Sequence, residues 1–543
     1  MSMDAVVNQF FAPVETDLID TLLANHKQEK NNIILVSDMV LKTEGLSSVF
    51  SYFVKGNVPD VYRHALSTSM FAKEGALKQL DARYWQEVMD LTKVNDYMPQ
   101  KRRSEWREQI NSGSTPDFND SNVRSTIITL LNSRKKFVAE KVDGIFQSLS
   151  SRHVTNCPEG FNKKMIVADV LDKYGYVSSD KTGIIDDLRS VLSKVMGRKE
   201  EFLGNTFKIL ENIKKLNLYG VWHEIDSVAL KVKLFKAGTV HIEIHPDMAI
   251  SMNEILAILY PMAIPEKYRK RNNKNNVKEF VLQDNLISMK LLSMLSEMKT
   301  PPLKSNMPAF KESCGWTDNK NSLYIHKYHT YAEKDIKELE EIMHLIGGQR
   351  KQYNQAVWFE FDYNPSDVIS LLIISGVYPD FKSYQYYPTK NELCDIVIEK
   401  ADIKPLDNCL EPSAGQGAIA RHLFKEKTTC IEISGINAAI LKSKGFKVCN
   451  EDFIKWSRKN AEQKFDKIIM NPPFSKNRAV LHVDTALTHL QETGKLVAII
   501  PATYKDRVLF DGYKHDYSDV YQGFFEGTQV AVIILCLEKC IVS

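Results

Sequence analysis

The sequence lacks the features of secreted, disulfide-bonded and membrane-spanning proteins. Its eight cysteines are scattered and form no Cys-x-x-Cys pair, so neither a disulfide framework nor a structural zinc site is indicated. No run approaches about 18 consecutive apolar residues, and the N-terminus lacks a basic segment ahead of an apolar stretch. We therefore expect reduced thiols, no metal, no membrane partner and a cytoplasmic location.

Charge of one sign is also scarce, since the formal net charge is only +3. This value is too small to indicate nucleic-acid binding by itself, so local clusters are the better evidence. A hydrophobic content of 43% indicates a folded globular chain. At roughly 150 residues per domain, 543 residues predict three or four structural units.

The strongest basic cluster lies within residues 267–278, where cations alternate with amides after two prolines. Such a segment suits contacts to backbone phosphates, although a solvated linker explains it equally well. A second candidate surrounds Lys101 to Arg107. The candidate phosphate-binding residues of the first cluster are Lys267, Arg269, Lys270, Arg271 and Lys274.

The part before residue 265 is predicted to be mainly helical. Apolar residues recur at helical spacing between Val123 and Leu149, which indicates a buried stripe. Residues 227–235 and 239–244 predict two strands around the turn Lys236-Ala-Gly238. His241, Glu243 and His245 alternate along the second strand, where a polar exposed face explains them better than a metal site does.

The tetrapeptide Asn471-Pro472-Pro473-Phe474 follows the apolar run of residues 465–470 and carries most of the functional information. An exocyclic amino group is a poor nucleophile because its lone pair is delocalised into the attached ring or carbonyl. The Asn471 side-chain oxygen and the Pro472 carbonyl are suited to accept its two N–H hydrogens, and Phe474 to stack on a ring. Prolines stiffen the turn. The pattern indicates methyl transfer onto a planar amino nitrogen, with a plain strand-ending turn as the alternative.

Three acidic positions precede this tetrapeptide in an order typical of a nucleotide-binding sheet. A short apolar strand ends at Glu411 and runs into a loop with Ser413, Gly415 and Gly417, followed by a predicted helix. Glu411 is suited to bind the ammonium group of a cationic amino acid, and Gly415 and Gly417 to let the backbone approach a ligand. The next strand ends at Glu432, spaced as a ribose-binding carboxylate. The segment 446–453 predicts a third strand, with Asp452 and Phe453 suited to bind and stack an adenine.

With these motifs, residues from about 380 to 543 resemble a class I S-adenosylmethionine-dependent methyltransferase of the N6-adenine group, in the gamma motif order. The resemblance implies a Rossmann-like α/β fold, S-adenosylmethionine as cofactor, and double-stranded DNA with a flipped-out adenine as substrate. It also implies that Tyr387, Pro388 and Thr389 help to enclose the methionine end of the cofactor. Residues 479–490, 495–500 and 529–537 would complete the sheet as a helix and two strands.

The preceding part of the chain resembles an uncharacterised domain fused to methyltransferases of phages and mobile elements. Its likeness rests on Tyr84-Trp85, residues 153–156, Trp222 with Glu224, and the 236–241 turn. The implied division is a mainly helical α+β N-terminal domain with a possible DNA-binding role (1–265), a basic linker (266–281), a small α/β module (282–380) and the methyltransferase domain (381–543). The fusion favours a phage or mobile-element enzyme that protects DNA against restriction in a bacterial cell.

One departure from the gamma arrangement bears on DNA recognition. A target-recognition domain normally follows the catalytic motifs, but here residues 475–543 are used by the sheet. Sequence reading must then come from the region before residue 380, or the enzyme is nearly indifferent to sequence. Two alternatives remain. The first is the same chemistry on RNA adenine or on a protein glutamine, and Phe474 in place of Tyr argues against glutamine. The second is a non-catalytic cofactor-binding scaffold.

Overall fold

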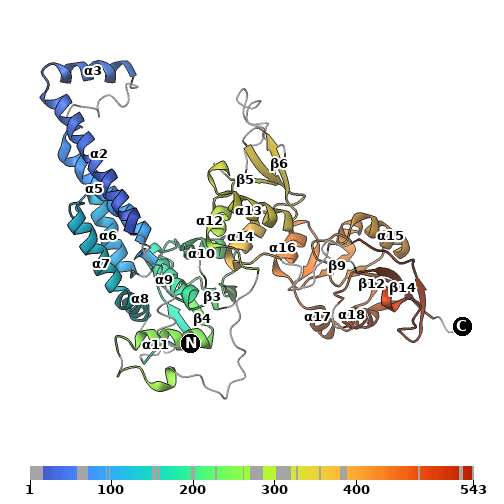
Figure 1. Ribbon diagram of the computed structural model, residues 1–543. Coiled ribbons are helices and arrows are strands. Elements are labelled where there is room, and N and C mark those ends of the chain that lie inside the picture. The colour runs from blue at the N-terminus through green and yellow to red at the C-terminus, as the bar shows by residue number, and fades with distance from the viewer. Residues whose placement is uncertain are drawn as a thin grey trace. The chain divides into compact units, whose positions relative to one another are not determined.

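A computed structural model shows a chain that divides into two compact units (Figure 1). The first unit comprises Met1–Leu210 and Leu218–Leu282, and the second comprises Glu211–Asn217 and Gln283–Ser543. The structure describes residues 16–57, 71–92, 94–96, 98–149, 156, 159–196, 198, 202–226, 229–260, 262–269, 285–300, 319–325, 328–353, 356–379, 388–474, 477–524 and 530–540.

The first unit begins with the helices α2 (Thr16–Lys42), α3 (Leu46–Asn57), α5 (Lys73–Thr92), α6 (Gln100–Ser112), α7 (Asp120–Asn132) and α8 (Arg134–Ser148). Side chains of α2, α5, α6 and α7 share one aromatic core. Trp85 is fully buried at the centre, and its indole N–H donates to the Pro116 carbonyl over 2.7 Å. The stripe from Val123 to Leu149 divides between α7 and α8, with a break at Ser133.

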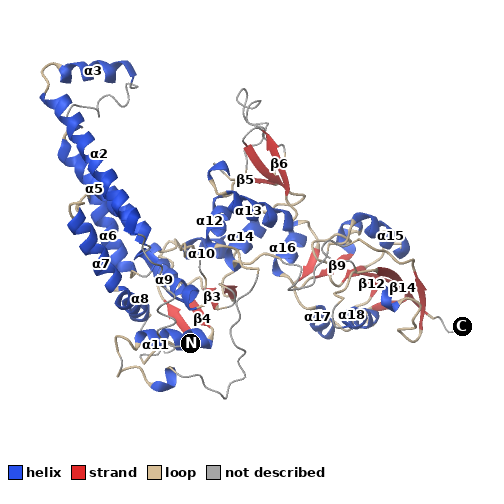
Figure 2. Ribbon diagram, viewed as in Figure 1, coloured by secondary structure: helices blue, strands red, loops and turns tan. Residues whose placement is uncertain are grey.

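The rest of the first unit is a four-stranded antiparallel sheet with helices packed against it (Figure 2). The strand order is β1-β4-β3-β2, with β1 (Lys164–Val167), β2 (His223–Ile225), β3 (Leu230–Leu234) and β4 (Val240–Ile244). The predicted hairpin is confirmed, since β3 pairs with β4 through the Lys236–Gly238 turn. The accompanying helices are α9 (Ser179–Val195), α10 (Thr206–Lys215), which ends in the second unit, and α11 (Pro246–Leu256).

The second unit starts with a small α/β module. Strands β5 (Ser322–Tyr324), β7 (Ala356–Glu360) and β6 (Gln349–Tyr353) form an antiparallel sheet, accompanied by helices α12 (Met289–Glu297), α13 (Glu333–Leu345) and α14 (Ser366–Ser375). The Gln416 side chain donates to the Leu345 carbonyl over 2.6 Å, and Lys444 lies 3.0 Å from the Asp362 carboxylate. The module therefore contacts the glycine loop of the following domain directly.

The last domain is built on a seven-stranded sheet of order β10-β9-β8-β11-β12-β14-β13. Its strands are β8 (Cys409–Glu411), β9 (Thr428–Ile431), β10 (Lys447–Cys449), β11 (Phe465–Met470), β12 (Leu490–Pro501), β13 (Tyr513–Tyr517) and β14 (Val532–Lys539). Strands β8 to β12 are mutually parallel, whereas β14 runs antiparallel to its neighbours β12 and β13. The carboxyl ends of β8, β9 and β11 consequently meet at one edge.

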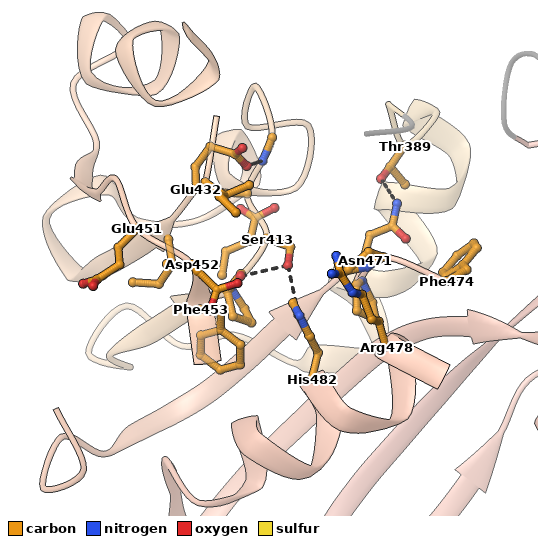
Figure 3. A pocket seen from close by; sticks show the side chains of 18 of the residues that line it. Thr389, Ser413, Glu432, Glu451, Asp452, Phe453, Asn471, Phe474, Arg478 and His482 are labelled. Carbon is orange, nitrogen blue, oxygen red and sulfur yellow. Dashed lines mark hydrogen bonds between the residues drawn. The ribbon is translucent and has the colours of Figure 1, made fainter. Parts of the chain in front are cut away.

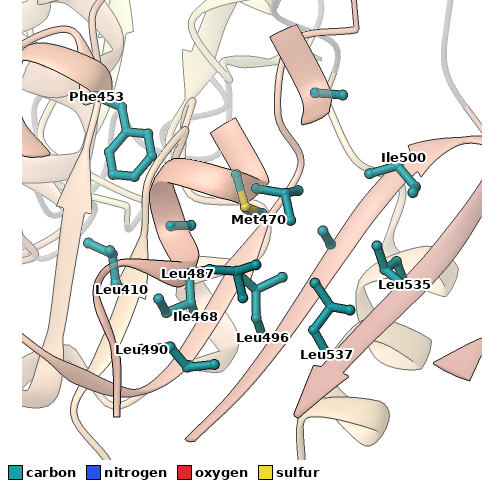
Figure 4. Close-up of a cluster of buried hydrophobic side chains, with 14 of the residues drawn as sticks. Leu410, Phe453, Ile468, Met470, Leu487, Leu490, Leu496, Ile500, Leu535 and Leu537 are labelled. Carbon is teal, nitrogen blue, oxygen red and sulfur yellow. The ribbon is translucent and has the colours of Figure 1, made fainter. Parts of the chain in front are cut away.

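Alternation along these strands creates a hydrophobic core on each face of the sheet. One face packs against α17 (Phe453–Lys459) and α18 (Arg478–Leu487), and Figure 4 shows side chains of this core, among them Leu410, Ile468 and Leu535. The opposite face packs against α15 (Asn391–Ala401) through a second set that includes Cys409, Ile469 and Ile534. Helix α16 (Gly435–Ser443) covers the β9 and β10 end.

Two predictions about this domain are wrong in detail. The glycine loop leads into a single 3₁₀ turn, Ala420–His422, rather than an α-helix, because Leu423 turns inward and is buried against the α15 face. The third strand stops at Cys449, because the Asp452 carboxylate accepts the Lys455 N–H over 3.0 Å and starts α17. Within the described part of the chain, no helix has the length and apolar character needed to cross a bilayer.

Candidate cofactor and substrate pocket

A pocket opens at the carboxyl edge of β8, β9 and β11, where parallel sheets place their ligand sites (Figure 3). Its walls bring together residues that lie far apart in the sequence. Of the residues predicted from the sequence, the pocket is lined by Thr389, Glu411, Ser413, Gly415, Glu432, Asp452, Phe453 and Asn471 to Phe474.

Glu411 is the most unusual group in this pocket. It ends β8 and is only 2% exposed, and its Oε2 atom has no hydrogen-bond partner among the described residues. Burial, with a further contribution from the nearby Glu432 carboxylate, raises the pKa of Glu411 well above its ordinary value. A buried acceptor of this kind fits a cationic donor such as the ammonium group of the methionine end of S-adenosylmethionine.

Glu432 follows β9 and shapes the glycine loop. Its two carboxylate oxygens accept the N–H groups of Gly415 over 2.8 Å and of Ser434 over 2.7 Å. Burial raises the pKa of Glu432 to about 7, against the opposing effect of these hydrogen bonds. Because a carboxylate oxygen can accept more than one hydrogen bond, both oxygens of Glu432 can still accept hydrogen bonds from the hydroxyls of a ribose.

Asp452 and Phe453 lie on the wall formed by the start of α17. The Asp452 backbone is extended and its side chain caps the helix, so the carboxylate is held at the pocket wall. Phe453 is 3% exposed and belongs to the core under α18. The pair thus offers a fixed acceptor beside an apolar ring edge, which fits an adenine.

Asn471 directly follows β11, and its orientation is set by a neighbour from a distant segment. The Asn471 Nδ2 atom donates to the Thr389 hydroxyl over 3.1 Å (Figure 3). Thr389 is 7% exposed and precedes α15. This bond uses one N–H of the amide and leaves the oxygen of Asn471, a residue of the pocket lining, available as an acceptor.

The remaining residues of the tetrapeptide extend the wall beyond Asn471. Pro472 is buried, whereas Pro473 and Phe474 are half-buried. Figure 3 shows Phe474 on the side of Asn471 away from Glu432 and Asp452, and its ring packs at the margin of both sheet cores. A base held by Asn471 would therefore lie between the cofactor-type acids and the Phe474 ring.

The pocket lining also includes residues that were not predicted from the sequence. Among them are Arg478 and His482, which lie one turn apart on α18. Burial lowers the pKa of His482 to about 4, and its Nδ1 atom lies 3.5 Å from the Ser413 hydroxyl. His482 is therefore a neutral positioning group at physiological pH, while Arg478 supplies a cation at the rim. A cation and a histidine one turn apart in an amphipathic helix carry no distinguishing sequence signal.

The other predicted site residues either do not line the pocket or lie outside the described residues. Gly417 does not line the pocket; its φ is +86° and an added Cβ would lie 2.9 Å from Leu441 Cδ2, so this glycine permits tight packing. Tyr387 lies outside the described residues, whereas Pro388 is described beside Thr389. In the basic cluster, Lys267 pairs with Glu159 at 3.0 Å and Arg269 is half-buried. The cluster's remaining candidates, Lys270, Arg271 and Lys274, also lie outside the described residues.

Comparisons with known proteins give one family match and a set of similar structures. Residues 77–262 match a domain of unknown function, DUF4942. No curated protein matches the chain. TrmN from Thermus thermophilus is 14% identical with a TM-score of 0.24, covering 38% of this chain and 68% of its own.

Two restriction-modification proteins are also similar. A modification subunit assigned to a type I restriction enzyme from Vibrio vulnificus is 12% identical with a TM-score of 0.26, covering 38% of this chain. A chain from a type I restriction-modification system is 14% identical with a TM-score of 0.25, covering 28% of this chain. The chain spans 57% and 42% of the lengths of these two proteins, respectively.

The architecture of the last domain follows from its own sheet. Seven strands, parallel except for the inserted β14, with a glycine loop after β8 and acids after β8 and β9, fit the α/β fold of class I methyltransferases.

Proposed function

We propose that the protein is an S-adenosylmethionine-dependent methyltransferase that modifies the N6 amino group of an adenine flipped out of DNA. The observation that carries this proposal is the fixed orientation of Asn471. One N–H of its amide is donated to Thr389, so its oxygen remains to accept a target N–H in a pocket that also holds the buried Glu411 carboxylate, whose Oε2 atom has no partner among the described residues.

The pocket residues suggest a division of roles. Glu411 would bind the cofactor's ammonium group, Glu432 its ribose, and Asp452 with Phe453 its adenine. When bound, S-adenosylmethionine supplies an electrophilic methyl group on a sulfonium. No metal is required for this chemistry.

At the substrate side, the Asn471 oxygen and the Pro472 carbonyl would accept the two amino hydrogens. These bonds hold the nitrogen closer to tetrahedral geometry and direct its lone pair toward the methyl carbon. The carbon–nitrogen bond would form as the methyl carbon–sulfur bond of the sulfonium breaks, with the electron pair of that bond remaining on sulfur, and the proton would then leave the nitrogen to solvent. Phe474 would stack on the flipped base.

The proposed domain division assigns this chemistry to residues 381–543. Target binding then falls to residues 1–265, the basic linker 266–281, or the module 282–380. Protection of phage or mobile-element DNA against restriction is the biological role that this combination favours.

The test is to offer the purified protein labelled S-adenosylmethionine with three acceptors in separate reactions: unmethylated double-stranded DNA, RNA, and a protein extract. Digestion and mass spectrometry then identify the modified nucleoside or amino acid. We expect N6-methyladenine in the DNA. Label in RNA adenine or glutamine instead, with none in DNA, would contradict the proposed substrate.

A further inference from the structure

Aromatic rings and lysines gather at one end of the four-stranded sheet in the first unit, remote in sequence from the methyltransferase motifs. Trp222, Lys233, Phe235, Lys236 and Tyr219 form this group, which we name the aromatic–lysine face. Lys233 lies 4.8 Å from the centre of the Trp222 ring and 5.4 Å from that of Phe235, and Lys236 lies 5.6 Å from that of Tyr219. The lysines are thus held beside ring faces, where cation–π attraction positions them.

Strand geometry explains why these side chains share one face. Lys233 alternates with the buried residues Val232 and Leu234, so it points away from the core. The Gly220 N–H donates to the Leu234 carbonyl over 2.8 Å, which brings Tyr219 and Trp222 alongside the end of β3. The face therefore belongs to the sheet itself and needs no ligand to assemble it.

A neighbouring turn adds two exposed rings. Tyr174 and Tyr176 are 74% and 67% exposed, respectively, and Trp222 is 37% exposed. The turn is fixed against the β3–β4 turn, because the Val170 N–H donates to the Gly238 carbonyl over 2.8 Å. Gly238 has a φ of +85°, and an added Cβ would lie 2.8 Å from the Leu171 carbonyl oxygen, so the close approach requires glycine.

The lysines at the two ends of this sheet surface have different partners. At the far end Lys231 pairs with Glu224 at 2.6 Å and Lys163 pairs with Glu243 at 2.8 Å, so the charges there compensate one another. At the aromatic–lysine face the lysines contact rings instead.

The adjoining turn brings its own charges. Lys173 lies 5.0 Å from the centre of the Tyr174 ring. The Asp172 carboxylate in that turn accepts the N–H groups of Tyr174 and Tyr176, each over 2.8 Å, and Asp169 is an exposed acid before it.

We propose that the aromatic–lysine face, with the Tyr174 and Tyr176 turn, binds single-stranded DNA. Exposed rings interleaved with lysines match a strand whose bases stack on the rings while its phosphates contact the cations. A duplex hides its base faces, and an acidic peptide offers charge without a series of planar rings. The choice of DNA over RNA rests on the proposed function, whereas the binding of a single strand does not.

The test measures binding by the full-length protein without cofactor, using fluorescence anisotropy of a labelled oligothymidylate of about 20 nucleotides, longer than the roughly 4–16 nucleotides that one such module covers. The variants are Trp222→Ala, Lys233→Ala and the double change Tyr174→Ala with Tyr176→Ala. The matched control is Lys231→Ala, which lies on the same face of the same strand but pairs with Glu224. Circular dichroism confirms folding, and the exposed tyrosine pair serves as the readout if Trp222→Ala unfolds.

Trp222→Ala is expected to weaken binding about 5- to 150-fold, the range of one lost stacking contact, and the double tyrosine change, which removes two rings, by at least as much. Lys233→Ala should also make the logarithmic salt slope less steep by about 0.7. Lys231→Ala should leave the affinity unchanged.

Equal affinity for all variants would overturn the proposal, as would equal binding to polyglutamate or a preference for a duplex or for oligouridylate. Because the assay contains no cofactor, the outcome is independent of methyl transfer. If the wild type methylates DNA but the variants bind the oligonucleotide as tightly as the wild type, only the proposed binding face is overturned. If binding depends on the rings but the wild type does not methylate DNA, only the proposed function is overturned.

Discussion

The change Glu411→Gln should affect cofactor affinity and folding stability in opposite directions. Gln keeps the shape of the side chain but removes the negative charge from a buried position with an unpaired Oε2 atom. A hydrogen bond to a charged group contributes about 1.5–3 kcal/mol. Loss of the charge at the ammonium site should therefore weaken S-adenosylmethionine binding by about 10- to 150-fold.

The same change should act on stability in the opposite direction. The pKa of Glu411 is raised in the folded protein, so its contribution to the free energy of unfolding is full below the unfolded pKa and is lost as pH rises through the folded pKa. Glu411→Gln cannot titrate and avoids this loss. The cofactor-free variant should therefore be as stable as the wild type in acid and more stable at alkaline pH.

Isothermal titration calorimetry from acid to alkaline pH measures the affinity for S-adenosylmethionine, and urea unfolding over the same pH range measures the free energy of unfolding. In the wild type, binding of a cation selects the ionised carboxylate, so affinity should rise with pH and a proton should be released. Glu411→Gln should lose most of that rise. Unchanged affinity in the variant, or a variant less stable than the wild type at alkaline pH, would refute the assigned role of Glu411.

Three further predictions concern neighbouring parts of the site. Thr389→Val removes the acceptor of the Asn471 NH₂ group and should lower the single-turnover methylation rate about 5- to 150-fold, because an unpaired buried group costs roughly 1–3 kcal/mol. Thr389→Ser keeps the hydroxyl and should retain most of the rate. If Thr389→Val instead lowers cofactor affinity, Thr389 acts on the cofactor. Gly417→Ala should cost about 1–2 kcal/mol of stability, measured by urea unfolding, because of its positive φ, while cofactor affinity is kept. Gly415→Ala should carry a similar backbone cost, since its φ is also positive, and should in addition reduce cofactor affinity because Gly415 lines the pocket; equal affinities would contradict the distinction. Because the pKa of Glu432 is raised from 4.5 to about 7, the unfolding free energy of the cofactor-free protein should fall as pH rises between these values, and Glu432→Gln should flatten that fall.

The sequence was most informative where a chemical role needs fixed residue types in a fixed order. The glycine loop, the acids Glu411 and Glu432, and the 471–474 tetrapeptide were assigned from sequence, and the structure gathers them around one pocket. Parallel strands explain why these residues lie together, because motifs that follow successive strands must meet at the same edge. The Lys236–Gly238 hairpin was equally predictable, since its glycine adopts a positive φ.

Features that depend on tertiary contacts could not be predicted. Arg478 and His482 reach the pocket only because α18 packs against the sheet, and the Thr389–Asn471 bond joins segments far apart in the chain. In the first unit, Arg189 is 1% exposed and donates to Asp226 over 2.6 Å, a burial that composition alone would not suggest. A buried charged side chain of this kind can be recognised only once the position of its partner is known.

The role of Asn471 in methyl transfer is tested by comparing the wild type with Asn471→Ala in two parallel measurements: N6-methyladenine formed in DNA, by mass spectrometry, and affinity for S-adenosylmethionine, by calorimetry. We expect abundant N6-methyladenine with the wild type and none detectable with the variant, at nearly equal cofactor affinity. A variant that methylates DNA at the normal rate, or a wild type that binds the cofactor yet leaves adenine unmodified, would contradict it.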